Sequence, residues 1–219
     1  MHVQIVLFDG VDPLDAVAPF EVFVAGGIAS AGVVSVEMVA AEGPREVVSG
    51  SGGLVLRATA ALDPDRAGLV LVPGAAGRVG EPGEVPDDES IPVLLGRTLT
   101  TALPTLLKAA MDNPAVTVTS VCGGSLVLAM AGLLEGRYAT THHQGMDLLD
   151  ATGVRAVDAR VVDDGDLVTG AGVTSGLDLG LYLLEREVGP RIAHAVEQLF
   201  AYERRGVVWR AHGPAPVTV

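Results

Sequence analysis

The chain has 219 residues, of which 49% are hydrophobic, and it carries a formal net charge of −13. This length and apolar content suffice for one domain with a sizeable core, whereas the negative charge disfavours nucleic acid and anionic membranes as partners. No uninterrupted apolar run reaches the roughly 18 residues of a membrane-spanning helix, and no positively charged leader precedes the first apolar run, so we expect a cytoplasmic protein.

Apolar runs that end in turn residues predict the strands. The first, 3–8, ends at Asp9-Gly10. Asp12-Pro13 then supplies an N-cap and an N1 proline for a helix to about residue 24, which Gly26-Gly27 is expected to stop. The later predicted strands are 33–40, a short strand 54–57 in a hairpin, 69–72, 116–121, a short extended stretch at 137–141 and a hairpin within 161–168.

Segments with helical spacing alternate with these strands. Residues 91–111 have this spacing, but Pro104 should kink or split the helix. A second helix is predicted at 125–131, with Gly132 just beyond its end. The remaining predicted segments are a surface loop at 77–88 and helices at 146–152, 176–188 and 191–202. The alternation predicts one α/β domain over residues 1–219, with a mostly parallel central sheet covered by helices on both faces.

The strongest chemical signal is Ser120-Val121-Cys122-Gly123-Gly124 at a strand-to-helix junction. A nucleophile on such a tight turn projects outward, while the following helix presents free N–H groups. Cys122 is the only cysteine, so an intramolecular disulfide is excluded and a thiolate-rich zinc site is disfavoured. The alternative is a buried structural cysteine, but packing alone does not explain two glycines directly after it.

Asp15 lies in the first turn of the first predicted helix, near the carboxyl edge of the sheet, where ligands of open α/β sheets bind. Asp12 and Asp15 also form an ordinary helix-capping arrangement, and both interpretations stay open. His142 and His143 are a candidate base, metal site or surface pair, and the absence of a suitably spaced carboxylate disfavours a metal. Pro73-Gly74-Ala75 ends a strand and could supply a second backbone N–H to an oxyanion.

Together these motifs resemble the DJ-1/PfpI superfamily over nearly the whole chain. The matching segments are LFDG at 7–10, LDxxxPFEVF at 14–23, VPG at 72–74, VCGG at 121–124, AGLLEG at 131–136, ATTH at 139–142 and GVTSGLD at 172–178. The resemblance implies a three-layer, flavodoxin-like sandwich of the class I glutamine amidotransferase type with a nucleophile elbow. It also implies that Asp15 faces Cys122, that His142 assists, and that Gly74 and Thr174 contact substrate. It implies no cofactor.

Within the superfamily the chain is most similar to isonitrile hydratases, because Asp15 is an aspartate where other branches have glutamate. Those hydratases carry Thr directly after the cysteine and PfpI-type peptidases carry His, whereas this chain has Gly123. The departure removes a hydroxyl from the site and argues against peptidase activity. Another branch carries a DNA-binding helix-turn-helix module, a role that the acidic chain ending at Val219 does not favour.

The resulting expectation is a hydratase that adds water to a small isonitrile and releases an N-substituted formamide. Cys122 attacks the carbon, Asp15 carries a proton, and the N–H groups of Gly123 and Ala75 steady the developing charge. The alternatives are glyoxalase-type chemistry on 2-oxoaldehydes and a sensor in which Cys122 is oxidised without turnover. The family resemblance and the apolar segment 207–209 further predict a homodimer, unless that tail folds back over its own domain.

Overall fold

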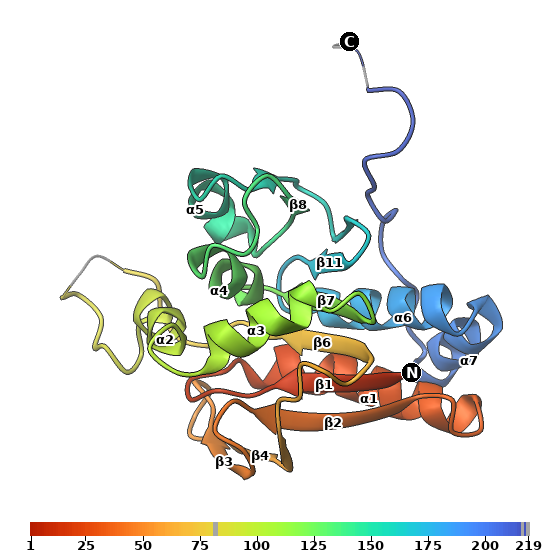
Figure 1. Ribbon diagram of the computed structural model, residues 1–219, viewed down its shortest axis with the longest axis horizontal. Helices are drawn as coiled ribbons and strands as arrows, with labels where there is room; N and C mark the ends of the chain where they lie inside the picture. Colours follow the sequence, from red (N-terminus) through yellow and green to blue (C-terminus); the bar gives the residue numbers. More distant parts are fainter. Residues whose placement is uncertain (81–82, 216, 218–219) are drawn as a thin grey trace.

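The computed structural model describes residues 1–80, 83–215 and 217, and a mixed β-sheet runs through its centre (Figure 1). Among these residues the sheet has seven strands in the order β10-β11-β7-β6-β1-β2-β5. All neighbours are parallel except the antiparallel pair β10–β11. In chain order the strands are β1 (His2–Val6), β2 (Ser35–Ala40), β5 (Ala60–Ala61), β6 (Gly68–Val72), β7 (Val116–Val121), β10 (Val161–Asp163) and β11 (Leu167–Gly170). Two smaller pairs flank the sheet: antiparallel β3 (Arg45–Val48) with β4 (Val55–Ala58), and parallel β8 (Tyr138–Ala139) with β9 (Arg155–Ala156).

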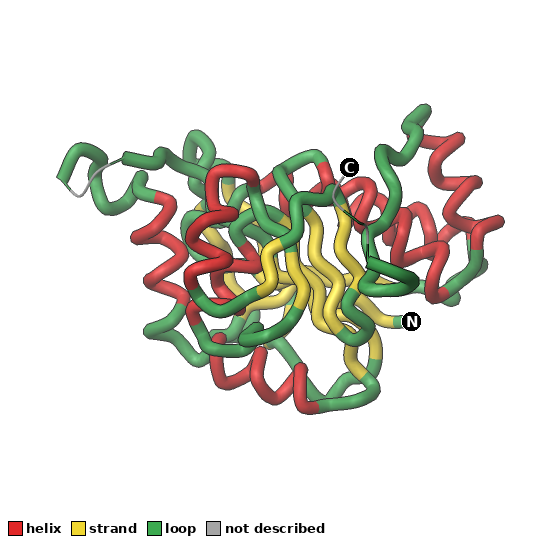
Figure 2. Tube along the Cα trace, turned by 90° about the horizontal axis from the view of Figure 1, so that it is seen from above, coloured by secondary structure: helices red, strands yellow, loops and turns green. Residues whose placement is uncertain are grey.

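Helices cover both faces of the sheet, as Figures 1 and 2 show. One face carries α1 (Pro13–Ala29), α6 (Ser175–Glu187) and α7 (Pro190–Phe200), which pack on one another. The other face carries α3 (Leu103–Asp112) and α4 (Gly124–Met130), both against β7. The helices α2 (Ile91–Thr98) and α5 (Met146–Ala151) pack against α4, and the 3₁₀ turn η1 (His143–Gly145) leads into α5. The expected three-layer α/β sandwich with a mostly parallel sheet is confirmed.

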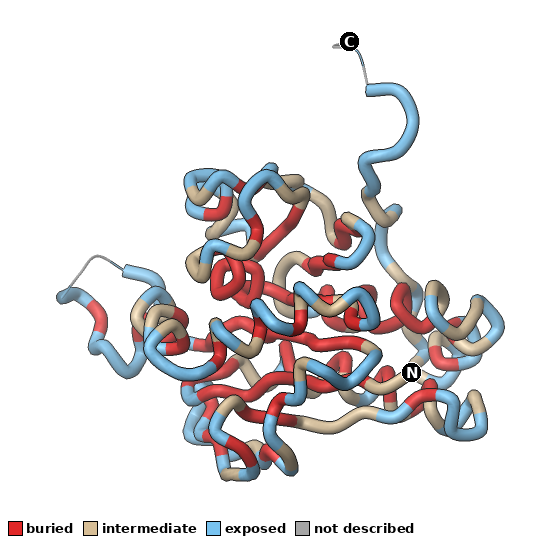
Figure 3. Tube along the Cα trace, in the orientation of Figure 1, coloured by how far each residue is buried: buried red, intermediate tan, exposed pale blue. Residues whose placement is uncertain are grey.

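The core lies between the sheet and its two helical layers, where Figure 3 shows continuous buried chain. Strand β6 reads Gly-Leu-Val-Leu-Val, and its last three residues are fully buried. Such continuous apolar runs are what a strand covered on both faces requires, in place of an alternating pattern. The carboxyl ends of β1, β6 and β7 therefore meet at one edge, directly beneath the loops that carry the candidate motifs.

The predicted end of the first helix is wrong. The helix α1 continues through Gly26-Gly27 to Ala29. A Cβ atom at position 26 would lie 2.6 Å from Leu184 of α6, and one at position 27 would lie 2.6 Å from the Val34 carbonyl oxygen. The two glycines allow close packing inside a continuing helix, and their modest propensity cost is overridden by tertiary contacts.

Most other predicted elements are confirmed, with boundaries shifted by a few residues. The 91–111 segment divides into α2 and α3, and Pro104 sits in the first turn of α3, where its missing N–H costs nothing. The predicted loop at 77–88 contains no helix or strand within its described residues, and positions 81–82 lie outside them. The short strands β5 and β9 were not predicted, because two residues are too few to show a period.

The C-terminal segment packs on its own chain only as far as Trp209, and residues 210–215 beyond it are exposed. Trp209 pairs with β10 through two backbone hydrogen bonds of 2.9 Å, to Val161 and Asp163. Its ring lies 4.9 Å from the ring of Tyr138. The tryptophan is therefore not the exposed apolar surface that the sequence predicted, although Val207 remains 90% exposed. No helix within the described ranges has both the length and the apolar character needed to cross a bilayer.

Candidate active site

Cys122 sits on a strained turn between β7 and α4. Its φ angle is 54°, in the left-handed region that side chains other than glycine rarely adopt. The surrounding chain fixes this conformation. The Cys122 N–H donates to the carbonyls of Gly170 (3.1 Å) and Ala171 (2.9 Å), while the Cys122 carbonyl accepts from the Thr141 hydroxyl at 2.6 Å. Strain held by several neighbours at once is typical of a functional position, and the geometry is that of a nucleophile elbow.

The glycines around the elbow are required by close backbone contacts. A Cβ at Gly124 would lie 1.9 Å from the Val72 carbonyl oxygen, which is part of β6 and cannot move aside. A Cβ at Gly74 would lie 2.6 Å from the Gly123 nitrogen and 2.8 Å from Asp15 Oδ2. Position 74 is therefore where strand β6, the elbow and the first helix touch.

We expect Gly124→Ala to destabilise the protein by about 3 kcal/mol or more, because the new methyl group overlaps the strand backbone. The matched control is Gly96→Ala in α2, where a Cβ meets nothing within 4 Å. That variant should be unchanged or more stable by up to about 1 kcal/mol, through helix propensity. Urea unfolding midpoints of the two variants test this. Equal midpoints would show that the elbow tolerates a side chain at 124.

Asp15 is fully buried in the first turn of α1. Its Oδ2 accepts a hydrogen bond of 3.0 Å from the Gly74 N–H, whereas Oδ1 has no hydrogen-bond partner among the described residues. The helix is capped by another residue, since Asp12 Oδ1 accepts from the Leu14 N–H at 2.9 Å. The two acidic residues thus have separate roles: Asp12 caps α1, and Asp15 faces the strand end and the elbow.

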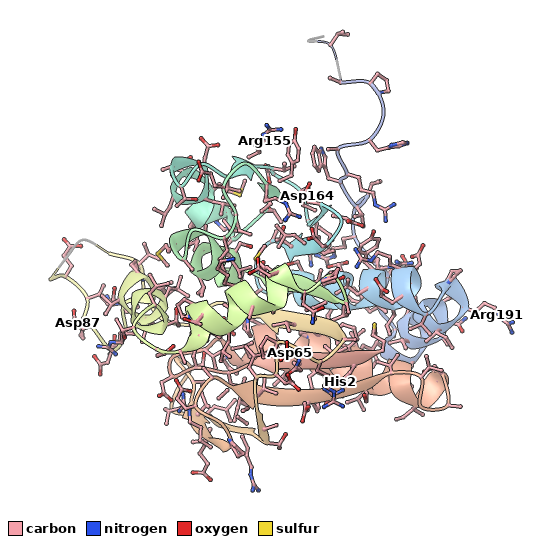
Figure 4. The ribbon with its side chains drawn as sticks, viewed as in Figure 1. His2, Asp65, Asp87, Arg155, Asp164 and Arg191 are labelled. Atoms are coloured by element: carbon pink, nitrogen blue, oxygen red, sulfur yellow. The ribbon has the colours of Figure 1, made fainter. Side chains whose placement is uncertain are left out.

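Burial dominates the electrostatics of the pair formed by Asp15 and Cys122. Removal from water, followed by the charge of Asp12, raises the pKa of Asp15 to about 8 despite the Gly74 hydrogen bond. Burial and the neighbouring Asp15 charge also raise the pKa of Cys122 well above its usual value, and the Gly123 N–H acts in the opposite direction. The unpartnered Oδ1 fits a protonated carboxyl. Most other charges lie outside the core, like the labelled Asp87, Arg155 and Arg191 at the periphery in Figure 4.

The thiol opens into a cleft of about 690 Å³ at the carboxyl edge of the sheet. Cys122 lines this cleft and is 8% exposed, so most of the residue is buried. The walls are mostly apolar, and their apolar side chains are Ala75, Ala76, Val79, Ile91, Pro92, Leu95, Leu126, Met130, Leu148 and Val173. Such a surface favours a substrate with an apolar substituent.

Three further predicted site residues line the same cleft: His142, Gly123 and Ala75. Within the described part of the chain, neither the Gly123 nor the Ala75 N–H donates to a backbone carbonyl, and the Gly123 N–H acts on the Cys122 sulfur. His142 Nδ1 accepts from the Gln144 N–H at 3.3 Å, which leaves Nε2 as the donor. Burial, and then the charge of His143, lowers the pKa of His142, so the ring is neutral near pH 7.

The structure does not bring Gly74 or Thr174 to the cleft surface. Gly74 lies behind the elbow and positions Asp15, as its hydrogen bond shows. The Thr174 hydroxyl accepts from Arg160 at 2.9 Å, and its neighbour Val173 lines the cleft in its place. Helix α6 begins at Ser175, and the turn before it points Thr174 towards the arginine. The expected substrate contacts by these two residues therefore have no support in the geometry.

Several cleft residues escaped prediction because they lie far from the cysteine in sequence. Arg78 and Glu89 come from the long loop, and Gly50 and Ser51 come from the β3–β4 turn. The sequence pattern predicts only a capping role for Asp12, yet the residue also lines the cleft. Its place in the segment Leu7–Asp15, directly after β1, was the one available signal. No group of three or more His, Cys, Asp or Glu side chains that could hold a metal ion occurs among the described residues.

Comparison with known proteins agrees with this geometry. The sequence pattern of the DJ-1/PfpI family matches residues 1–186. The chain is 36% identical over 203 residues to the isonitrile hydratase of Pseudomonas putida, covering 92% of this chain and 78% of that protein.

Two solved structures are similar over most of the chain. A ThiJ/PfpI family protein from Pseudomonas syringae has a TM-score of 0.75 and 26% identity, covering 94% of this chain and 76% of that one. Drosophila melanogaster DJ-1beta has a TM-score of 0.74 at 18% identity, covering 92% and 98%, and shows the shared fold. From its sequence match and its fold, the chain belongs to the DJ-1/PfpI family.

Proposed function

We propose that this protein is a cysteine-dependent hydratase that converts an isonitrile with an apolar substituent into an N-substituted formamide. The observation that carries the proposal is the position of Cys122, on a strained elbow beside the buried carboxyl of Asp15, at the base of an apolar cleft. The similarity to the Pseudomonas putida isonitrile hydratase supports the same reaction type. An isonitrile needs one nucleophile and one proton at the same carbon, which is what this pair can supply.

In the first step, the protonated Asp15 gives its proton to the isonitrile carbon, and the Cys122 sulfur forms a bond to that carbon. The thiol proton passes to the Asp15 carboxylate as the S–C bond forms. The product is a thioimidate, in which the carbon carries one hydrogen, the sulfur and the C=N bond. Asp15 ends the step protonated again, so it can act as an acid once more. A pKa of about 8 keeps this carboxyl protonated at neutral pH.

In the second step, water adds to the thioimidate carbon and the nitrogen takes a proton from Asp15. The proton lost by water returns to the carboxylate. Cleavage of the C–S bond then releases the formamide and restores the Cys122 thiol, with the last proton again moving through Asp15. Gly123 and Ala75, with their backbone N–H groups, and the neutral His142 line the cleft in which the water and the polar atoms of the intermediate would lie.

Isonitrile hydratases carry a threonine directly after the cysteine, whereas this chain has Gly123. The site therefore lacks the threonine hydroxyl at this position. A Cβ at position 123 would lie 3.1 Å from Leu95 Cδ1, so the Leu95 side chain fills the adjacent space. Gly123 has an ordinary helical conformation, with φ −65°, and the glycine is therefore not demanded by the backbone. The local effect is a more apolar cleft beside the sulfur, which fits an alkyl or aryl substituent on the isonitrile.

A side-by-side assay tests the proposal. Purified protein is given an alkyl isonitrile or methylglyoxal, and a separate sample is oxidised with hydrogen peroxide and examined by mass spectrometry. Formamide from the isonitrile supports the hydratase. Lactate from methylglyoxal without formamide would replace it with glyoxalase-type chemistry. No product from either compound, together with ready formation of a Cys122 sulfinate, would favour a sensor.

We further propose that the protein forms a symmetric homodimer beside the cleft. Apolar side chains remain exposed around its rim, since Leu14 is 47% exposed and Val48 and Leu54 are each 52% exposed. Leu14 lies close to the cleft residue Asp12, and the other two flank the β3–β4 turn, whose Ser51 lines the cleft. Symmetric dimers are the commonest oligomers, and an exposed apolar rim is typical of an interface.

Sedimentation at micromolar concentration is expected to give twice the 22.4 kDa mass of the chain. The double variant Leu14→Glu, Leu54→Glu should sediment as a monomer, because it places two charges per chain in the interface. Val207→Glu, which changes the exposed tail, is the matched control and should stay dimeric. A monomeric wild-type protein would rule the dimer out.

A further inference from the structure

Asp12 brings a second carboxylate to the cleft that contains the thiol. Its backbone N–H donates to the Gly74 carbonyl at 2.9 Å, and the Gly74 N–H in turn bonds Asp15, so Asp12 is held close to the reacting pair. One carboxylate oxygen, Oδ1, caps the helix. The other, Oδ2, makes no hydrogen bond or ion pair with the described residues, although the side chain is partly buried and lines the cleft.

The other charges in the cleft do not cancel Asp12. Arg78 and Glu89 line the outer part and face each other, with Nη1 and Oε2 3.7 Å apart, so this pair is close to neutral as a unit. His142 is the other titratable group among the described lining residues besides the thiol, and its lowered pKa keeps it neutral. The field of Asp12 reaches the sulfur, since its charge raises the pKa of both Cys122 and Asp15.

We infer that Asp12 is a specificity-determining residue, which slows the reaction of anionic compounds with Cys122 relative to neutral compounds of the same size. A negatively charged substrate would enter an apolar cleft whose one unpaired charge, among the described residues, has the same sign. Two like charges about 7 Å apart, at an effective dielectric constant of about 40, repel by roughly 1 kcal/mol, which corresponds to about a fivefold effect on rate. The inference rests on Cys122 being the reactive group of the cleft and does not depend on the reaction that it catalyses.

Alkylation of Cys122 measures this selection directly. Iodoacetamide and iodoacetate are similar in size and both transfer a CH₂ group to sulfur. An S–C bond forms, the C–I bond breaks, iodide leaves and the thiol proton passes to buffer. The measured quantity is the ratio of the two second-order rate constants, amide over acetate, divided by the same ratio for glutathione. Because Cys122 is the only cysteine, mass spectrometry of the intact protein follows a single site.

The variant is Asp12→Asn, because asparagine caps a helix about as well as aspartate and should preserve α1. A change in the pKa of the thiol affects both reagents equally and cancels in the ratio. The matched control is Glu21→Gln, which removes one charge from an exposed position of the same helix, outside the cleft lining. We expect the ratio to fall about fivefold in Asp12→Asn and to stay within about 1.5-fold of the wild type in Glu21→Gln.

An unchanged ratio in Asp12→Asn would overturn the inference, since Asp12 would then have no effect on selection. An equal fall of the ratio in Glu21→Gln would also overturn it, since the selection would then come from the net charge of the protein. Failure of both reagents to alkylate the wild-type thiol, even at a pH raised to favour the thiolate, would also overturn it, because Cys122 would then not be a reactive group of the cleft. The link to the proposed function is tested separately, by comparing an alkyl isonitrile with isocyanoacetate in the two variants. If neither isonitrile reacts while the alkylation ratio falls as expected, the hydratase proposal fails and the role of Asp12 stands.

Discussion

Replacement of Cys122 by alanine is expected to lower kcat/KM for isonitrile hydration by at least about a thousandfold, to the background of the assay. The sulfur forms the bond that defines the intermediate, and no other cysteine exists in the chain to replace it. Cys122→Ser should be almost as inactive, because a serine hydroxyl is a much weaker nucleophile at neutral pH without a dedicated base. Initial rates at several isonitrile concentrations give the effect.

The fold should survive this change. The backbone strain at position 122 is held by the carbonyls of Gly170 and Ala171 and by Thr141, and none of these contacts involves the sulfur. We expect the free energy of unfolding of Cys122→Ala to fall by no more than about 1–2 kcal/mol, measured in urea. An alanine variant that folds normally and keeps its activity would falsify the mechanism.

Replacement of Asp15 by asparagine is expected to lower kcat/KM by about a hundredfold or more, because the amide cannot give a proton to the isonitrile carbon. Asparagine keeps the shape of the side chain, and its carbonyl oxygen can still accept the Gly74 hydrogen bond. The pH profile should change as well. The protonated carboxyl is the active form, so the wild-type kcat/KM should fall as pH rises through about 8, and the variant should lack this fall.

The pKa of the Cys122 thiol should also change in the Asp15→Asn variant. The Asp15 charge helps to raise the pKa of Cys122, so the pKa of this thiol should move down in Asp15→Asn. The ultraviolet absorbance of the thiolate measures the shift, and the single cysteine makes the assignment direct. Loss of stability without any change in the rate or in the thiol titration would mean that Asp15 is a purely structural residue.

The pH dependence of the free energy of unfolding tests the raised pKa of Asp15 independently of activity. Its pKa is raised by folding, from its ordinary value near 4 to about 8, so the folded state holds its proton more tightly than the unfolded chain does. The stability associated with this group is therefore fully present below pH 4 and is lost progressively as pH rises to about 8. Relative to Asp15→Asn, the wild-type protein should lose several kcal/mol between these pH values, at up to about 1.4 kcal/mol per pH unit. Urea unfolding of both proteins at pH 5 and pH 8 makes the comparison.

Features that depend on local contacts and on the spacing of apolar residues could be predicted from the sequence alone. The run Val116–Val121 ends in Cys122-Gly123-Gly124, and the structure places these residues on a strand, a strained turn and a helix start. The Asp12-Pro13 cap and N1 proline likewise began α1 where expected. Apolar runs covered on both faces and turn residues at their ends are strong local signals, so the layer architecture followed from them.

The end of α1 depends on packing that residue spacing does not show, because Gly26 lies against Leu184 of α6, which is far away in the sequence. The same holds for Asp15. Its capping pattern was ambiguous in the sequence, and its raised pKa arises from burial beneath β6 and the elbow. The cleft walls come from loops and helices spread between Asp12 and Val173. Burial and the distance between charges are properties of the packed chain, and neither is encoded by residue spacing.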